Sequence, residues 1–134
     1  MQRHILIVDD EPNFRFSTEL ALKRKGFRVS QAGDGKEALD SILNAERNPP
    51  PFDLILMDME LPTLSGTEII QQMHEKGIRT PIMVVSGSID TDLYNGLTRL
   101  GCLSIYFKPV SEKILLARIS ELLQGTKTIV PGCR

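Results

Sequence analysis

Five short runs of apolar and β-branched residues are spaced along the chain, at residues 5–8, 27–30, 54–57, 82–85 and 103–107. The first, third and fourth runs are apolar at every position, whereas a strand with one face in water alternates apolar and polar residues. Continuous apolar runs of this length are typical of strands that are covered on both faces of a sheet. The pattern therefore predicts five strands, with the three fully apolar ones in the centre of a sheet.

Segments with a helical spacing of apolar residues separate these runs. The first predicted helix begins at Pro12, which suits a first helical position, and ends at Gly26. Two later helices are predicted to begin with capping boxes, at residues 34–37 and 65–68, where Asp or Ser is followed three residues later by Glu. The positions expected to face inward are Phe14, Thr18, Ala21 and Leu22, then Ala38, Leu39, Ile42 and Leu43, then Ile69, Ile70 and Met73, then Leu93, Leu97 and Leu100 before a closing Gly101, and finally Leu115, Ile119 and Leu122.

The strict alternation of strand and helix predicts an α/β fold with a doubly wound, five-stranded parallel sheet. The proline-rich run at residues 48–51 is predicted to be an extended connector on the surface. One domain is expected over residues 1–125. Residues 126–134 show no periodicity and are interpreted as a tail or as the start of a linker.

Composition narrows the range of functions. The 134 residues carry 16 Lys and Arg against 17 Asp and Glu, and a formal charge of -1 argues against nucleic acid as the main partner. No apolar run approaches the roughly 18 residues that a membrane span needs. Two cysteines, Cys102 and Cys133, are too few for a disulfide framework, and this favours a reduced, cytoplasmic location.

Polar residues follow the predicted strands at the points where the strands end. Asp9 and Asp10 follow the first strand, Asp58 the third, Ser86 the fourth and Lys108 the fifth. In a doubly wound sheet, ligands bind at the carboxyl ends of the strands, so these five side chains are expected to meet at one edge. Each has an ordinary structural explanation when taken singly, as a turn residue, a helix N-terminal acid or a surface lysine. Their coincidence at the strand ends favours a functional site.

Three carboxylates that gather at one edge repel one another unless a cation lies between them. Hard oxygen ligands that leave room for water suit Mg²⁺, so a magnesium site is predicted at Asp9, Asp10 and Asp58. A zinc site is not expected, because His4 and His74 have no partners at ligand spacing. The chain also lacks a phosphate-binding Gly-Lys-Ser/Thr loop and a dinucleotide fingerprint.

The set of motifs resembles the receiver domain of two-component response regulators. The resemblance covers roughly residues 3–124 and rests on Ile-Leu-Ile-Val-Asp-Asp-Glu-Pro at 5–12, Asp58 with Leu61, Pro62 and Gly66 downstream, Ser86, and Lys108 with Pro109. It implies a flavodoxin-like three-layer sandwich with strand order 2-1-3-4-5 and five flanking helices. It also implies a phosphoacceptor switch that is not an enzyme in the usual sense, although it promotes its own Mg²⁺-dependent phosphorylation and dephosphorylation.

The resemblance assigns a role to each site residue. Asp58 matches the aspartate that takes a phosphoryl group from a histidine kinase. Asp9 and Asp10, with Asp58 itself and the backbone carbonyl of Glu60, match the Mg²⁺ ligands. Ser86 and Lys108 match the hydroxyl and the cation that contact the phosphoryl oxygens. Pro109 matches a proline that usually follows a cis peptide bond.

One departure from the family pattern concerns the switch. Ile105 stands where the family usually has Tyr or Phe, three residues before the lysine, and Tyr106 is expected on the opposite face of the strand. An isoleucine cannot exchange a hydrogen bond, so activation is expected mainly at residues 86–88 and the start of the following helix. The fourth helix, fifth strand and fifth helix are expected to form the partner surface, with Ile105 as a constant apolar patch on it.

Two other functions compete with the phosphoacceptor switch. A pseudo-receiver that binds partners without phosphorylation is the alternative, but such a domain usually loses part of the site. A phosphatase of the haloacid dehalogenase type needs Asp-x-Asp after its first strand, and Asp9-Asp10-Glu11 does not provide it. The expected partners are a sensor histidine kinase or phosphotransfer protein and an effector domain or downstream protein. Phosphorylation-dependent dimerisation stays open, and no membrane contact or direct nucleic-acid binding is expected.

Overall fold

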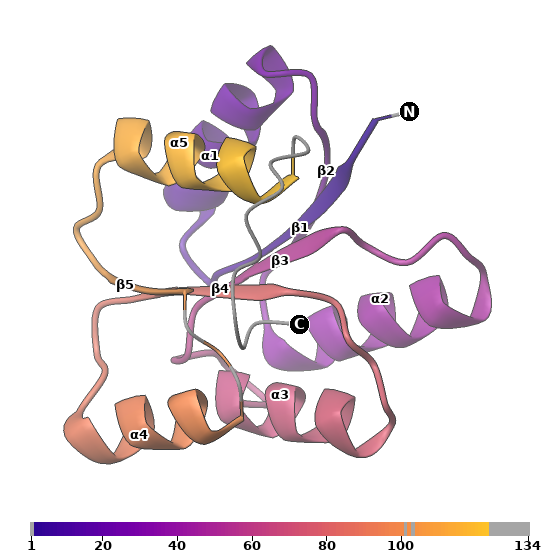
Figure 1. Ribbon diagram of the computed structural model, residues 1–134, viewed down its shortest axis with the longest axis vertical. Helices are drawn as coiled ribbons and strands as arrows, with labels where there is room; N and C mark the ends of the chain where they lie inside the picture. The colour runs from indigo at the N-terminus through magenta and orange to yellow at the C-terminus, as the bar shows by residue number, and fades with distance from the viewer. Residues whose placement is uncertain (1, 101, 103, 124–134) are drawn as a thin grey trace.

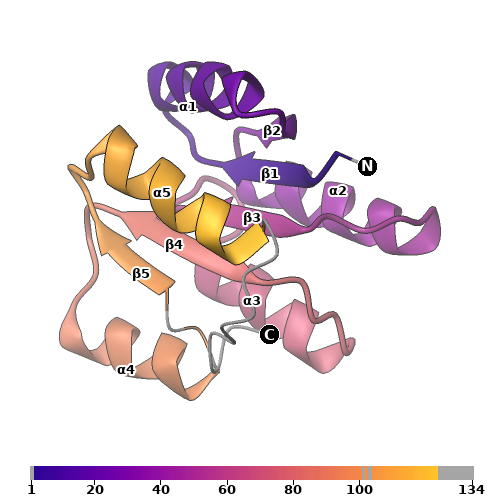
Figure 2. The same cartoon turned by 45° about the horizontal axis from the view of Figure 1, so that its top comes forward.

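A computed structural model describes residues 2–100, 102 and 104–123. It contains five parallel strands in the order β2-β1-β3-β4-β5, as the resemblance implied. Helices α1 and α5 cover one face of the sheet and α2, α3 and α4 cover the other (Figures 1 and 2). The elements are β1 (His4–Val8), α1 (Pro12–Arg24), β2 (Arg28–Ala32), α2 (Gly35–Arg47), β3 (Leu54–Met57), α3 (Gly66–Glu75), β4 (Ile82–Ser86), α4 (Thr91–Arg99), β5 (Ser104–Phe107) and α5 (Glu112–Leu123).

The three central strands bury side chains on both faces, which explains their continuous apolar sequence. In β1, Leu6 and Val8 belong to the core under α2 and α3, whereas Ile5 and Ile7 belong to the core under α1 and α5. The same division holds in β3 and β4. Within the described residues, no helix is long and apolar enough to cross a membrane.

One edge strand and the start of one helix differ from the sequence prediction. Strand β2 covers Arg28–Ala32 instead of 27–30, because Phe27 is buried in the core before the strand begins. The cap of α2 is half of the predicted box: Asp34 accepts a hydrogen bond from the Glu37 N–H, but the Glu37 carboxylate accepts from Gly33 instead.

The reciprocal capping box at Ser65 and Glu68 is confirmed. In α5 the fully buried residues are Leu115, Ile119 and Leu123, and Leu122 is only partly buried. The predicted helix end at Gly101, the predicted strand start at residue 103 and the predicted tail at 126–134 lie outside the described residues.

The start of α2 packs against the loop between β3 and α3. The Gly35 N–H donates to the Pro62 carbonyl oxygen over 3.0 Å, and the Lys36 N–H donates to Thr63 Oγ1 over 3.0 Å. A Cβ atom on Gly35 would lie 2.5 Å from the carbonyl carbon of Leu64 and closer still to its oxygen. The contact therefore needs a glycine, and it fixes the loop that follows Asp58.

Candidate functional site

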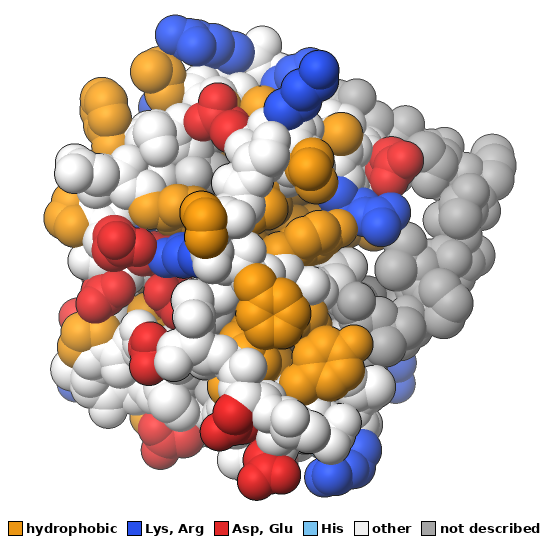
Figure 3. Space-filling view, turned by 90° about the vertical axis from the view of Figure 1, so that its left-hand side faces the viewer, with side chains coloured by type: hydrophobic (Ala, Val, Ile, Leu, Met, Phe, Trp, Pro, Cys, Tyr) orange, Lys and Arg blue, Asp and Glu red, His pale blue; other side chains and the backbone are white. Residues whose placement is uncertain are grey.

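The polar residues that were predicted at the strand ends lie together at one edge of the sheet. Backbone hydrogen bonds that continue the sheet fix their positions: the Asp58 N–H donates to the Val8 oxygen over 2.9 Å and the Lys108 N–H donates to the Ser86 oxygen over 2.9 Å. Because all strands are parallel, their carboxyl ends share this edge. Figure 3 views this side of the molecule and shows acidic side chains beside a basic one, next to a patch of hydrophobic side chains.

Lys108 forms the electrostatic centre of the site. Its Nζ lies 2.7 Å from Asp9 Oδ2, 2.8 Å from Glu11 Oε1 and 3.3 Å from Asp58 Oδ2. The ammonium also lies 4.6 Å from the centre of the Phe14 ring, within the range of a cation–π contact. Burial lowers the pKa of Lys108, but the hydrogen bonds to Asp9 and Glu11 outweigh it, so the pKa is raised overall. The lysine therefore stays charged at neutral pH.

Asp9 is buried, and burial raises the pKa of its carboxyl group, while the hydrogen bonds from Lys108 and the Glu11 N–H only partly offset this. A pKa above the value in the unfolded chain means that the folded state binds more protons. The stability that Asp9 contributes is therefore present at acid pH and is lost as the pH rises through its folded pKa. At neutral pH the site gains stability from any added positive charge.

The carboxylate of Asp58 is held in one orientation. Its Oδ1 accepts hydrogen bonds from Ser86 Oγ over 2.7 Å and from the Glu60 N–H over 3.1 Å. Its Oδ2 faces Lys108. The side chain is only 7% exposed. An oriented carboxylate next to a fixed cation is suited to act as a nucleophile.

The donor set fits a hard divalent cation. Asp9, Asp10 and Asp58 each offer a carboxylate oxygen, and these atoms lie within 4.8 Å of one another. Asp10 is exposed and has no hydrogen-bond or ion-pair partner among the described residues, so its carboxylate is free to bind an ion. All three donors are oxygens, and an exposed position leaves room for water ligands, as Mg²⁺ requires.

Strand β5 confirms the predicted alternation of Ile105 and Tyr106. Ile105 packs on the core under α2, α3 and α4, whereas Tyr106 packs on the opposite core and its hydroxyl accepts a hydrogen bond from Arg118. Ile105 is partly buried, and its expected role as an apolar patch on the partner surface stays a prediction. The apolar side chain that this strand exposes is Phe107, which is 54% exposed.

Two contacts of Lys108 were not foreseen. The motif at 5–12 contains Glu11 but gives it no role, and the helical pattern places Phe14 only on an inward helix face. Glu11 could have been found as the third carboxylate of an acidic run that follows a strand end. No sequence signal distinguishes Phe14 from the other apolar residues of the first helix, because its contact depends on where the fifth strand ends.

Replacing Asp10 by asparagine is expected to weaken Mg²⁺ binding by at least the ~10-fold that is typical of changes around a metal site. Mg²⁺ should raise the melting temperature of the wild type, because a ligand that binds only the folded state stabilises it. In the same titration, the melting temperature of the Asp10→Asn variant should rise only at higher Mg²⁺ concentrations. Asp40→Asn, which removes an exposed carboxylate from α2, is the matched control. Equal Mg²⁺ affinity in the Asp10 variant and the wild type would refute the assignment.

Comparisons with known proteins agree with this geometry. The sequence model of the response regulator receiver domain matches residues 5–120. The alkaline phosphatase synthesis transcriptional regulatory protein PhoP of Bacillus subtilis is 33% identical over 133 residues, which are 98% of this chain and 53% of PhoP. Response regulator ArlR of Staphylococcus epidermidis is 36% identical over 122 residues, which are 90% of this chain and 52% of ArlR. The chain thus spans about half the length of these curated relatives.

A solved structure shows the same fold. The response regulator receiver domain protein (CheY-like) from Methanospirillum hungatei JF-1 superposes with a TM-score of 0.83 at 30% identity, and the match covers 92% of this chain and 95% of that one. The family match, the strand order and the acidic edge with its lysine therefore agree. The chain belongs to the receiver domains of two-component response regulators.

Proposed function

We propose that Asp58 is the phosphoacceptor of this switch and that it takes the phosphoryl group from a phosphohistidine of a sensor kinase or phosphotransfer protein. The observation that carries the proposal is the orientation of its carboxylate by Ser86 and the Glu60 N–H, beside the Lys108 ammonium. A carboxylate oxygen of Asp58 attacks phosphorus, the new O–P bond forms, and the P–N bond to the histidine breaks. The histidine nitrogen keeps the electron pair of that bond.

Asp9, Asp10 and Asp58, with the Glu60 backbone carbonyl, are proposed to hold Mg²⁺. When bound, the ion neutralises negative charge on the transferring phosphoryl oxygens. Lys108 supplies a second, permanent positive charge from the other side. Its Nζ now bonds to Asp9 and Glu11, so it can reach a phosphoryl oxygen on Asp58 by a short shift between neighbouring acceptors.

Ser86 is proposed to convert the chemical change into movement. Its hydroxyl donates to Asp58 Oδ1 in this structure, and a phosphoryl oxygen becomes a stronger, charged acceptor once Asp58 is modified. Ser86 is fully buried at the end of β4, so a shift of its side chain has to pull the exposed Gly87 and Ser88 with it. The surface made by α4, β5 and α5 is proposed to display this change to partners.

The same site is proposed to promote dephosphorylation, because it places Mg²⁺ and Lys108 around a phosphoryl group that water can reach. No described residue favours the pseudo-receiver alternative, since Asp9, Asp10, Asp58, Ser86 and Lys108 are all in place. The domain is proposed to occupy residues 1–125, with 126–134 as a tail or as the start of a linker to an effector domain or another downstream partner. Signalling from such a kinase is proposed to take place in the cytoplasm.

Incubation with Mg²⁺ and a small acyl phosphate, followed by an intact-mass measurement, tests the proposed chemistry. One phosphoryl adduct per chain is expected, and chelation of the metal should prevent its formation because the carboxylates then repel the incoming phosphoryl group. If the intact mass does not change after incubation with Mg²⁺ and acyl phosphate, the result would support the pseudo-receiver instead.

Activation is expected to change amide hydrogen exchange mainly at residues 86–88 and at the start of α4. The physical reason is that Ser86 moves, while Ile105 has no hydroxyl with which to report the movement. The measurement compares exchange with and without beryllium fluoride as a phosphoryl mimic. Tyr106→Phe is the matched control, because it removes a hydroxyl from the opposite face of β5 and should leave the pattern unchanged. Protection changes confined to α1 and α2 would contradict the prediction.

A further inference from the structure

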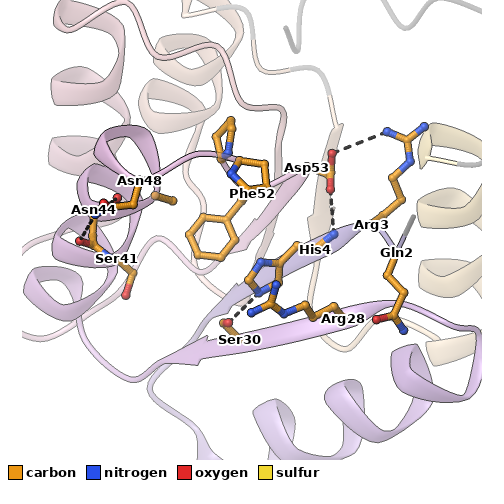
Figure 4. Close-up of a pocket in the computed structure, with 13 residues that line it drawn as sticks. Gln2, Arg3, His4, Arg28, Ser30, Ser41, Asn44, Asn48, Phe52 and Asp53 are labelled. Atoms are coloured by element: carbon orange, nitrogen blue, oxygen red, sulfur yellow. Dashed lines mark hydrogen bonds and ion pairs between the residues drawn. The ribbon is translucent and has the colours of Figure 1, made fainter.

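A second pocket lies at the opposite end of the sheet from Asp58. It is formed by the starts of β1 and β2, one side of α2 and the loop before β3, and it has a volume of about 900 Å³ (Figure 4). Small-molecule sites in proteins have volumes of roughly 300–1,000 Å³, so this pocket is large enough for an organic ligand. None of the residues of the phosphoacceptor site lines it.

The floor of the pocket brings two basic side chains together. His4 and Arg28 occupy the same register of adjacent parallel strands, so their side chains leave the sheet on the same face. The pKa of His4 is lowered, first by burial and second by the positive charge of Arg28. Arg28 has no carboxylate partner among the described residues. The sheet thus holds a guanidinium next to an imidazole, with Asp53 as the carboxylate that acts on His4.

The one carboxylate that lines the pocket is already engaged. Asp53 Oδ2 accepts a hydrogen bond from the His4 N–H over 2.8 Å, and Oδ1 lies 3.6 Å from the Arg3 guanidinium (Figure 4). With His4 neutral, the lining residues carry two guanidinium charges and one carboxylate charge. The excess positive charge is that of Arg28, and it fits an anionic ligand.

The walls add hydrogen-bonding groups and an apolar surface. Ser41 and Asn44 lie on the side of α2 that lines the pocket, and Asn48, the C-cap residue of α2, continues this polar stripe. The Asn48 side-chain amide donates to Asn44 Oδ1 over 3.0 Å. Ser30 Oγ lies 2.7 Å from His4 Nε2. Phe52 packs its ring on that of His4, with 4.7 Å between the ring centres. The pocket thus combines the positive charge of Arg28, side-chain amides on one wall and the Phe52 ring. This combination suits a polar molecule with an anionic group.

We propose that this pocket binds a small organic phosphate of about mononucleotide size, with its phosphate paired to Arg28. A guanidinium forms paired hydrogen bonds with phosphate oxygens, and no carboxylate among the described residues occupies the Arg28 guanidinium. The sugar or other polar part of the ligand lies along Asn44 and Asn48. This site is separate from the phosphoacceptor function and does not depend on it.

An NMR titration of the full chain with AMP, without Mg²⁺, tests the proposal. Saturable shifts are expected at the backbone amides of Ser30, Asn44 and Asn48, and adenosine should bind at least about tenfold more weakly because it lacks the charged group. Arg28→Gln should lower the AMP affinity by a similar factor. Arg28 is exposed, so the variant should keep the fold, and a melting curve checks this.

Arg24→Gln is the matched control, because Arg24 is an exposed arginine at the end of α1 that does not line the pocket. It makes the same change of charge and should keep the wild-type affinity. The proposal is overturned if AMP causes no saturable shift, if adenosine binds as well as AMP, if both arginine variants lose affinity equally, or if the shifts are confined to the edge with Asp9 and Lys108.

Discussion

The Asp58→Asn variant is expected to carry no phosphoryl group after incubation with Mg²⁺ and a small acyl phosphate, under conditions that modify the wild type. The amide keeps the shape of the carboxylate and can still accept hydrogen bonds from Ser86 and the Glu60 N–H. It lacks the negative charge that makes the oxygen a nucleophile, and it also removes one ligand from the metal site. Intact mass reports the adduct directly.

The control for this experiment is Asp90→Asn. Asp90 caps the start of α4 through a hydrogen bond from the Leu93 N–H, and asparagine caps helices about as well as aspartate. This variant makes the same chemical change away from the proposed nucleophile and should be modified like the wild type. An adduct that persists in Asp58→Asn would place the nucleophile at another carboxylate, with Asp10 the first to test because it is exposed.

Gly35→Ala is expected to lower the free energy of unfolding by about 3 kcal/mol, the upper part of the range for overpacked sites. The added methyl group meets the backbone of Leu64, which cannot rotate away as a flexible side chain can. This clash is relieved only if α2 moves away from the loop that follows Asp58. Thermal denaturation should show a melting temperature lower by roughly 10 °C.

Gly96→Ala is the matched comparison for the same substitution in another helix. No atom lies within 4 Å of a Cβ on Gly96, and alanine favours helix over glycine by about 1 kcal/mol, so this variant should be slightly more stable than the wild type. A Gly35→Ala protein as stable as the wild type would mean that the contact with Leu64 does not constrain the loop. The phosphoryl adduct of both variants should also be measured, because a displaced loop moves Glu60.

The central strands were predictable because burial on both faces requires apolar residues at every position of the strand. Leu54–Met57 was predicted to the residue, and the fold class followed from alternation with helices. The edge strand β2 is half covered, so Arg28 is exposed while the buried Phe27 lies before the strand. A short run of mixed polarity does not show which of its residues pair with a neighbour, and the predicted bounds were displaced for that reason.

The composition of the acidic edge was predictable because parallel strands bring their carboxyl ends together. The hydrogen-bond partners within that edge were not predictable from the sequence. The ammonium of Lys108 contacts Asp9, Glu11 and Asp58, and its distances to them depend on where the end of β5 places the lysine. In α2, the pattern at residues 34–37 predicts a reciprocal capping box. The Glu37 carboxylate instead accepts a hydrogen bond from the Gly33 N–H, in the loop before the helix.

The ion pairs of Lys108 also join parts of the chain that are synthesised at different times. The lysine lies 99 residues from Asp9 and 50 from Asp58 along the sequence. A nascent chain on the ribosome contains Asp58, the proposed acceptor, before it contains the counter-charge, and a fragment cut before β5 never acquires that charge. Such a fragment is therefore expected to hold the proposed acceptor without its cation.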